Sequence, residues 1–418
     1  MGIRDIYNLY SKHYLVDTDT RNIREYSLFF ALKGANFNGN EFAKKALELG
    51  AAFVIIDEIE FEIPQKTILV DNVLDTLQKL ARYHRLQLTA PIIALTGSNG
   101  KTTTKELIHA VLSTKYNTTA TLGNLNNHIG VPLTLLSMTP ETEIGIVEMG
   151  ANHQKEIEFL CTIAAPDFGY ITNFGKAHLE GFKGIAGVIK GKSELYTFLH
   201  THDKIAFVNP TDAIQIEKTK HLKTIYFPEY LKFTTADPFV NIKIKGTEIK
   251  SHLIGDYNYT NIAAAVTIGI HFKLENTQIK KAIENYIPSN NRSQIIKKKR
   301  NTIILDAYNA NPSSMEVALE NFSKLTKPSK IVILGDMFEL GSESEAEHQA
   351  IVNLADALCF SQTLYVGAHF YKTQTNNKQF KNFESLKEYI TTSSLDQQSI
   401  LVKGSRGMRL EQILDFIN

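Results

Sequence analysis

The sequence predicts an α/β protein of three domains with mostly parallel sheets, and three observations carry that prediction. The chain has 418 residues, which is long for one domain and fits two or three. An apolar run at residues 92–95 leads through a glycine-rich turn into a pattern with helical spacing. From residue 302 onward, strand-like apolar runs alternate with helical patterns, which is typical of parallel strands joined by helices.

Residues 1–88 are predicted to form a small α/β domain, with strands at 27–32, 52–56 and 67–70 and helices at 41–49 and 73–86. No catalytic cluster occurs in this stretch of sequence. Its polar turns, at Asp19, Thr20 and Arg21 and at residues 34–40, have two interpretations. Ordinary loop chemistry is the default for such turns. An arginine beside hydroxyls also suits a phosphate, so a ligand rim is the alternative.

Composition excludes several classes of function. The chain carries 45 basic and 44 acidic side chains, so no global charge attracts nucleic acid or a membrane surface. The two cysteines, Cys161 and Cys359, lie far apart in apolar or helical surroundings, which predicts reduced, buried thiols. Neither a targeting segment nor a membrane span is indicated. We expect a cytoplasmic protein, monomeric and without a nucleic-acid partner.

The second predicted domain, residues 89–290, begins with the strand, turn and helix just described. The turn contains glycines and a Gly-Lys-Thr sequence, which suits phosphate binding by backbone N–H groups and a helix N-terminus. Lys101 is expected to reach the outer phosphates, and Thr102 is expected to bind magnesium. The loop is shorter than the usual one, and an ordinary strand-to-helix turn is the alternative. The loop residues are Gly97, Ser98, Asn99, Gly100, Lys101, Thr102 and Thr103.

Polar residues follow the other strands of this domain. Glu148 ends the strand predicted at 144–147, where a magnesium-organising acid belongs in such sheets, although a surface glutamate is the alternative. His178 follows a strand predicted at 169–172. Residues 123–132 are expected to be a loop that presents amides, including Asn126 and Asn127.

The rest of the second domain has short strands, at 205–208, 224–227 and 240–244, and then an alanine-rich helix. Asn258 and Asn261 lie three residues apart at the start of that helix, where an amide can read the edge of a purine. Helix capping is the competing role for Asn258. A second boundary is expected between residues 288 and 300, and the basic run 297–300 is interpreted as a solvated connection.

Residues 291–418 are predicted to form an open α/β domain with a mostly parallel sheet. Three polar segments follow its strands, at residues 306–312, 335–341 and 403–407. Ligands bind beyond the carboxyl ends of parallel strands, so this sheet edge is expected to face a ligand. The predicted elements alternate between strand and helix: 302–305, 314–325, 330–334, 343–358, 363–366, 385–391, 399–402 and 410–417.

These motifs together resemble the Mur ligases, ATP-dependent enzymes that add amino acids to the peptide of the bacterial cell-wall precursor. The resemblance covers the whole chain and is strongest to the branch that adds D-alanyl-D-alanine to UDP-N-acetylmuramoyl-tripeptide. It implies an N-terminal domain for the UDP-sugar, a central P-loop ATPase domain and a Rossmann-like C-terminal domain. The matching segments are residues 19–21, 27–32, 96–104, 124–132, 148–150, 172–173, 178, 306–312, 335–337 and 404–406.

The resemblance also implies a mechanism and its residues. ATP phosphorylates the carboxylate of the tripeptide, and the amine of D-alanyl-D-alanine attacks the acyl phosphate. Lys101, Thr102, Glu148 and a magnesium ion would serve phosphoryl transfer. His178 and a carbamylated Lys192 would hold a second magnesium.

By the same resemblance, Asn261 recognises adenine, Arg292 and Asn309 lie at the nucleotide, and Asp19, Thr20, Arg21, Asn126 and Asn127 contact the muramoyl substrate. Tyr257 stands where many relatives have histidine, and another aromatic ring keeps the stacking face.

The sequence leaves two alternatives to this function. The branch that adds the third residue to UDP-N-acetylmuramoyl-dipeptide carries an Asp-Asn-Pro-Arg motif that is absent here. A P-loop nucleotide switch, which belongs to a different class, leaves the first domain and the polar strand ends unexplained. The third residue of the tripeptide, diaminopimelate or lysine, is left open.

Overall fold

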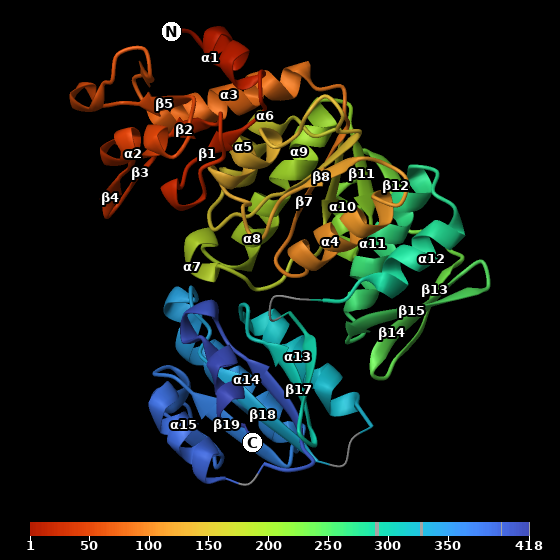
Figure 1. The fold of residues 1–418 in the computed structure, drawn as a ribbon. Coiled ribbons are helices and arrows are strands. Elements are labelled where there is room, and N and C mark those ends of the chain that lie inside the picture. The colour runs from red at the N-terminus through yellow and green to blue at the C-terminus, as the bar shows by residue number, and fades with distance from the viewer. Residues whose placement is uncertain (289–291, 327–328, 394, 418) are drawn as a thin grey trace.

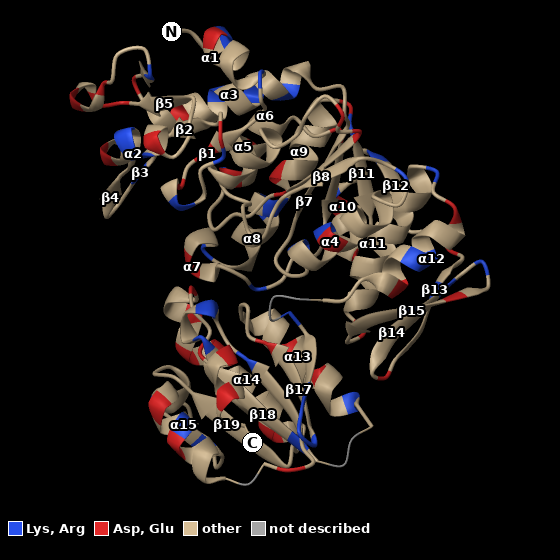
Figure 2. Cartoon of the chain, viewed as in Figure 1, with Lys and Arg blue, Asp and Glu red and all other residues tan. Residues whose placement is uncertain are grey.

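The computed structural model describes residues 1–288, 292–326, 329–393 and 395–417, and it places three α/β units along the chain (Figure 1). The predicted fold class is confirmed, since two of the three main sheets are wholly parallel and the third is parallel except for one edge strand. The predicted boundary at 290/291 falls outside the described residues. In Figure 2, acidic and basic positions are interspersed over all three units, as the balanced composition predicts.

The N-terminal unit has a four-stranded parallel sheet in the order β1-β2-β5-β6. Helix α3 packs on this sheet with its apolar stripe and also contacts α5 (Gly130–Leu135) and α6 (Glu156–Ala164) of the central unit. The strands are β1 (Val16–Asp17), β2 (Leu28–Phe30), β5 (Phe53–Ile56) and β6 (Thr67–Leu69), with the hairpin β3 (Lys33–Gly34) and β4 (Phe37–Asn38). The helices are α1 (Ile3–Tyr10), α2 (Ala43–Glu48) and α3 (Val73–Gln87), with short 3-10 turns at Thr20–Asn22, Gly39–Phe42 and Ile59–Phe61.

Buried polar contacts join this unit to the central one. The hydroxyl of Tyr10 donates to the carbonyl of Leu136 at 2.8 Å. Nε2 of His84 lies 3.0 Å from the carbonyl of Met138. Apolar side chains of α3 pack across the same boundary, so both polar and apolar contacts join the two units.

The central sheet is six-stranded and parallel, in the order β12-β11-β10-β7-β9-β8. Side chains of the four inner strands alternate between two cores, as the pleat requires. The strands are β7 (Ile92–Thr96), β8 (Thr118–Ala120), β9 (Ile144–Glu148), β10 (Phe168–Ile171), β11 (Ile205–Val208) and β12 (Lys223–Tyr226). An antiparallel sheet adjoins them, with β13 (Leu231–Ala236), β14 (Phe239–Ile244) and β15 (Thr247–Ile254).

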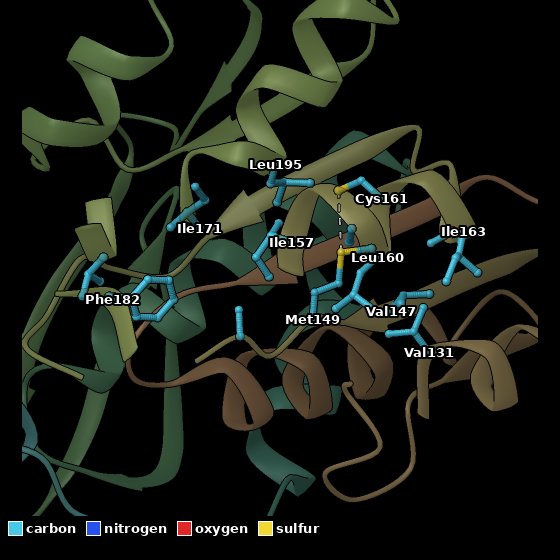
Figure 3. Close-up of a cluster of buried hydrophobic side chains, with 14 of the residues drawn as sticks. Val131, Val147, Met149, Ile157, Leu160, Cys161, Ile163, Ile171, Phe182 and Leu195 are labelled. Carbon is cyan, nitrogen blue, oxygen red and sulfur yellow. Dashed lines mark hydrogen bonds between the residues drawn. The ribbon is translucent and has the colours of Figure 1, made fainter. Parts of the chain in front are cut away.

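Helices cover both faces of the central sheet. One face packs on α5, α6 and α9, and Figure 3 shows its side chains, including the contact between Cys161 Sγ and Met149 Sδ at 3.8 Å. The other face packs on α4, α11 and α12. The helices are α4 (Lys101–Leu112), α5 (Gly130–Leu135), α6 (Glu156–Ala164), α7 (Leu179–Phe182), α8 (Ile185–Lys192), α9 (Glu194–Thr201), α10 (Ala213–Lys218), α11 (Asn258–His271) and α12 (Asn276–Asn285).

The C-terminal sheet has the order β16-β17-β21-β18-β19-β20, and only the pairing of β16 with β17 is antiparallel. The strands are β16 (Gln294–Lys298), β17 (Asn301–Asp306), β18 (Lys330–Gly335), β19 (Gln362–Val366), β20 (Lys378–Phe380) and β21 (Ser399–Lys403). The helices are α13 (Pro312–Lys324), α14 (Ser344–Ala357) and α15 (Phe383–Thr392), with 3-10 turns at Gly341–Glu343, Phe370–Lys372, Arg406–Met408 and Leu410–Asp415.

Four local predictions were wrong. Residues 297–298 belong to strand β16 rather than to a solvated connection, because they pair with β17 across a tight turn. The loop predicted over 123–132 ends at Ile129, where helix α5 begins with a buried apolar face. Residues 410–417 form a 3-10 helix only over Leu410–Asp415. Cys359 is exposed rather than buried, because it follows the end of α14 in a left-handed turn with φ of 52°.

Among the described residues, no helix is both long enough and apolar enough to cross a membrane.

Candidate active site

A cavity of about 1200 Å³ opens where the three units meet, beyond the carboxyl ends of the central strands. Its walls come mainly from the central and C-terminal units, and Gln78 of α3 reaches it from the N-terminal unit. Most of the predicted site residues line this cavity: Ser98, Asn99, Gly100, Lys101, Thr102, Thr103, Asn126, Asn127, Glu148, His178, Asn261, Arg292 and Asn309.

The phosphate loop joins β7 to α4, and its two glycines are required by the backbone. Gly97 has φ of 143°, and a Cβ there would lie 1.9 Å from the hydroxyl of Thr172. Gly100 has φ of 79°, and a Cβ there would lie 2.7 Å from Oδ1 of Asn261. Any side chain at these positions would therefore push the loop away from β10 or from α11.

The loop is also held by hydrogen bonds from the segment after β10. Nδ2 of Asn173 and the hydroxyl of Thr172 both donate to the carbonyl of Asn99, at 3.0 and 2.5 Å. The backbone N–H of Asn99 donates to Oδ1 of Asn173 at 3.0 Å, and the Ser98 hydroxyl donates to the Gly175 carbonyl at 2.8 Å. The loop is thus fixed at the N-terminus of α4, where backbone N–H groups and the helix dipole favour an anion.

Glu148 lies at the end of β9, 1% exposed, against the first turn of α4. Its Oε1 accepts hydrogen bonds from Nδ2 of Asn126 at 2.8 Å and from the hydroxyl of Thr102 at 3.2 Å. Its Oε2 is buried and accepts no hydrogen bond from any described residue, with the ammonium of Lys105 3.9 Å away. Carboxylate and hydroxyl oxygens are the donors that Mg²⁺ prefers, so Thr102 and Glu148 fit a magnesium ion.

Two lysines of α4, the half-buried Lys101 and the buried Lys105, lie near this carboxylate. Nζ of Lys101 donates to the carbonyl of Gly97 at 2.7 Å. Burial lowers the pKa of Lys101 and of Lys105, and the negative charge of Glu148 opposes that shift in both. Positive charge is therefore concentrated beside the phosphate loop, where it complements a polyphosphate.

The two residues predicted to hold a second metal, His178 and Lys192, each contact another group in the structure. Nδ1 of His178 is paired with Oε2 of Glu339, which belongs to the C-terminal unit, and this contact lowers the pKa of Glu339. Nζ of Lys192 lies behind the cavity wall, where it donates to the carbonyl of Ala151 at 3.1 Å. Burial lowers the pKa of Lys192 well below its ordinary value. Within the described residues there is no group of three or more His, Cys, Asp or Glu side chains able to hold a metal.

The predicted nucleotide residues form the other half of the cavity. Oδ1 of Asn261 accepts from the hydroxyl of Thr104 at 3.0 Å, so the start of α11 is tied to α4. The guanidinium of Arg292 stacks on Tyr308, with Cζ 3.6 Å from the ring centroid. Its Nε is buried and has no hydrogen-bond partner among the residues that the structure describes, which leaves a donor for a ligand. Oδ1 of the exposed Asn309 accepts from the N–H of Ala310.

Only some of the residues predicted to bind the muramoyl substrate line the cavity. Asn126 and Asn127 line the cavity, but both amides already make bonds: Asn126 with Glu148, and Oδ1 of Asn127 with the N–H groups that begin α5. Asp19, Thr20 and Arg21 do not line it. The carboxylate of Asp19 pairs with the guanidinium of Arg21 at 2.5 Å, and this pairing lowers the pKa of Asp19 to about 2.

Comparison with known proteins identifies the family. Three family models match the chain in succession: the Mur ligase family catalytic domain at residues 12–85, the Mur ligase middle domain at 95–269, and the Mur ligase glutamate ligase domain at 291–406. The chain belongs to the Mur ligase family.

Similar proteins match this Mur ligase almost from end to end. UDP-N-acetylmuramoyl-tripeptide–D-alanyl-D-alanine ligases from Bacillus subtilis and Escherichia coli are each 33% identical to it, and each match covers 96% of this chain and 92% of the relative. The crystal structure of MurF from Acinetobacter baumannii has a TM-score of 0.85 and 30% identity over 96% of this chain and 92% of that one. MurF from Thermotoga maritima in complex with ADP has a TM-score of 0.84 and 25% identity, with 96% of each chain covered.

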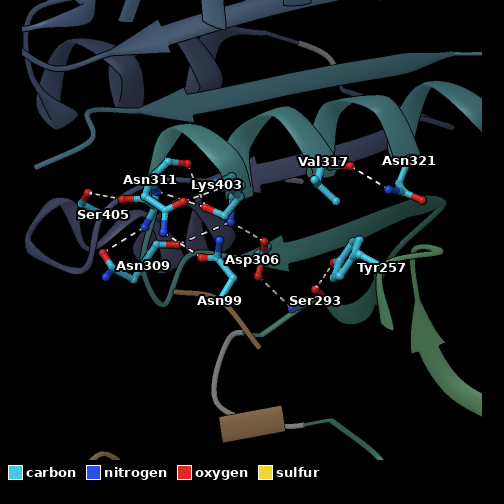
Figure 4. Close-up of polar contacts among 12 residues, drawn as sticks. Asn99, Tyr257, Ser293, Asp306, Asn309, Asn311, Val317, Asn321, Lys403 and Ser405 are labelled. Carbon is cyan, nitrogen blue, oxygen red and sulfur yellow. Dashed lines mark hydrogen bonds and ion pairs between the residues drawn. The ribbon is translucent and has the colours of Figure 1, made fainter. Parts of the chain in front are cut away.

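Sequence reasoning missed several residues at the cavity of this Mur ligase. Asp306 and Lys403 lie on neighbouring strands and form an ion pair at 2.5 Å (Figure 4). Asn311 donates from Nδ2 to Oδ1 of Asn99 at 2.7 Å and so joins the C-terminal unit to the phosphate loop (Figure 4). The polar segments that follow the C-terminal strands predicted that this sheet edge faces a ligand. They did not predict these particular contacts.

Proposed function

We propose that this chain joins D-alanyl-D-alanine to UDP-N-acetylmuramoyl-tripeptide with the consumption of ATP. The observation that carries the proposal is the cavity where a phosphate loop, the buried carboxylate of Glu148 and the strand ends of the C-terminal unit meet. The match to ligases of that name over 96% of the chain supports the choice of substrates. A cytoplasmic location is part of the same proposal.

The chemistry has two steps. An oxygen of the tripeptide carboxylate attacks the γ-phosphorus of ATP, the bond from that phosphorus to the β,γ-bridging oxygen breaks, and ADP leaves. The amine of D-alanyl-D-alanine then attacks the acyl carbon, phosphate leaves, and the nitrogen loses a proton. Phosphoryl transfer needs positioning and charge neutralisation above all.

The residues of the central unit have defined roles in this proposal. Ser98, Asn99, Gly100 and Thr103 surround the phosphates with the loop backbone, and Lys101 neutralises their charge. Thr102 and Glu148 would hold magnesium, which when bound would neutralise charge on the transferred phosphoryl group. Asn261, Arg292 and Asn309 face the rest of the nucleotide.

His178 and Lys192 form a narrower part of the proposal. A carbamate on Lys192 would supply an anionic oxygen beside His178 for a second magnesium, whereas an ammonium would repel the metal. The intact mass of the protein, measured from bicarbonate buffer, tests this part. A mass increase of one carbon dioxide that disappears in Lys192→Ala supports it, and an unmodified mass in the active enzyme contradicts it.

The muramoyl substrate is assigned to the remaining side of the cavity and to the N-terminal unit. Asn126 and Asn127 contact it from the loop before α5, and Asp19, Thr20 and Arg21 contact its UDP moiety from outside the cavity. The domain limits 1–88, 89–290 and 291–418 and the monomeric state belong to the same proposal.

The decisive experiment is ATP-dependent phosphate release with a matrix of substrates. UDP-N-acetylmuramoyl-dipeptide or UDP-N-acetylmuramoyl-tripeptide, with diaminopimelate or lysine as third residue, is combined with D-alanyl-D-alanine or a free diamino acid. Release that requires a tripeptide and D-alanyl-D-alanine is expected. Release with dipeptide and diamino acid would move the chain to the neighbouring branch, and release indifferent to all acceptors would favour a nucleotide switch.

A further inference from the structure

Arg292 lies in the linker between the central and C-terminal units, and its side chain makes few contacts that would fix its position. The guanidinium is held by the ring of Tyr308, while Nε has no hydrogen-bond partner within the described part of the chain. A stacked guanidinium can still slide over the ring, because stacking sets its distance more strictly than its lateral position. The position of Arg292 therefore depends on the backbone that carries it.

That backbone is fixed through the next residue, Ser293. Ser293 is 8% exposed and has φ of 50°, a left-handed conformation that is uncommon for residues other than glycine. Its N–H donates to Oδ1 of Asp306 at 3.1 Å, and Oδ2 of Asp306 accepts from Nζ of Lys403 at 2.5 Å. Such a conformation persists only where its surroundings over-determine it.

A second hydrogen bond to Ser293 comes from the central unit. The hydroxyls of Tyr257 and Ser293 lie 2.8 Å apart (Figure 4). The ring of Tyr257 lies against the backbone of Gly255. A Cβ at residue 255 would lie 2.3 Å from Cε1 of the ring, so only glycine allows the ring to take this orientation. The tyrosine hydroxyl is thus aimed at the linker, and a phenylalanine would fill the same space without reaching it.

We propose that Tyr257 is a positioning residue: its hydroxyl, through Ser293, holds Arg292 in place at the nucleotide side of the cavity. A continuous polar chain then runs from the start of α11 across the linker to two adjacent strands of the C-terminal sheet, as Figure 4 shows. This role rests on the proposed function, because Arg292 is assigned there to the nucleotide. Burial raises the pKa of the Tyr257 hydroxyl, so it remains protonated and able to donate.

The test is a thermodynamic cycle on the full chain with Mg-ADP as the probe. Tyr257→Phe and Ser293→Ala should each raise the dissociation constant for ADP and the KM for ATP about threefold to tenfold, the range expected for one net hydrogen bond, with a smaller change in kcat. The double variant should be no weaker than the weaker single one, because both changes remove the same bond.

Tyr259→Phe is the matched control. Tyr259 lies two residues further along α11, and its hydroxyl donates to the carbonyl of Leu231 at 3.1 Å, away from the linker. This variant should leave the ADP affinity within about twofold of the wild type. Equal losses of ADP affinity in Tyr257→Phe and Tyr259→Phe would overturn the proposal, since they would indicate general loosening of α11.

The background Arg292→Met decides whether the effect passes through Arg292. There, Tyr257→Phe should change the ADP affinity less than twofold, because the group it positions is gone. An undiminished effect in that background, or none in the wild type, would refute the role of Tyr257. A wild-type protein that binds ADP and shows acceptor-dependent turnover while the cycle fails would leave the proposed function standing, and one that does not bind ADP would refute both.

Discussion

The buried pair of Lys105 and Glu148 gives a prediction whose magnitude follows from the structure. The two side chains are 4% and 1% exposed, and Nζ lies 3.9 Å from Oε2. Removing one partner of a buried ion pair leaves an uncompensated charge and costs about 3–5 kcal/mol. Because Lys101 also attracts Glu148 and the pair is not in hydrogen-bond contact, we expect the lower end for Lys105→Met, about 3 kcal/mol.

A double variant that removes both charges distinguishes the effect of charge from the effect of side-chain shape. Glu148→Gln keeps an oxygen that can accept from Asn126 and Thr102 but removes the charge. Lys105→Met combined with Glu148→Gln should be within about 1 kcal/mol of the wild type, since replacing both charges is nearly neutral. The single Glu148→Gln variant and the double variant should both lose at least about a hundredfold in turnover, because a charged group at the reacting phosphates is lost.

Urea unfolding followed by circular dichroism measures these stabilities, since the chain has no tryptophan. Lys115→Met is the matched control: Lys115, just beyond α4, also donates to a carbonyl, that of Lys273 at 2.8 Å, but at an exposed site. It should cost less than about 1 kcal/mol. If Lys105→Met costs no more than the control, or if the two single effects simply add, the electrostatic reasoning is wrong.

Two further predictions concern a glycine and a histidine. Gly100→Ala places a Cβ 2.7 Å from Asn261 Oδ1 at φ of 79°, so ADP affinity measured by calorimetry should fall more than about tenfold, with about 1–2 kcal/mol lost in stability; unchanged affinity would contradict the assigned loop. Burial lowers the pKa of His84 from 6.5 to about 4, so its neutral form favours folding above pH 6.5 and up to about 3 kcal/mol is lost as pH falls toward 4. Urea unfolding of His84→Gln at pH 7 and pH 5 should show a shallower dependence than the wild type, and an equal dependence would refute this origin.

Local patterns were enough to predict the parts of the site that depend on neighbours in sequence. The phosphate loop and Glu148 follow directly from a strand that ends in a polar segment, and the sheet brings such ends together. The predicted three-unit fold followed in the same way from alternating strands and helices. Both depend on periodicity within ten or twenty residues.

Contacts between distant segments could not be predicted in this way. Residues 297–298 look solvated by charge alone, and only pairing with β17 makes them a strand. His178 meets Glu339 because a loop of the C-terminal unit reaches the central one, and no pattern near residue 178 signals this. The roles of His178, Lys192, Asp19 and Arg21 remain predictions, and the mass measurement above addresses that of Lys192.

Helix α4 explains why changes at the phosphate loop should spread across the whole cavity. Its first two turns contact four separate elements, so the helix cannot shift without disturbing each of them. These contacts are Thr102 with Glu148 of β9, Thr104 with Asn261 of α11, Lys105 with the carbonyl of Gly123, and Glu106 with the hydroxyl of Tyr286. The C-terminal unit, in contrast, meets the loop itself through single side chains such as Asn311. If the proposed function is right, variants of α4 should therefore alter nucleotide and muramoyl binding together.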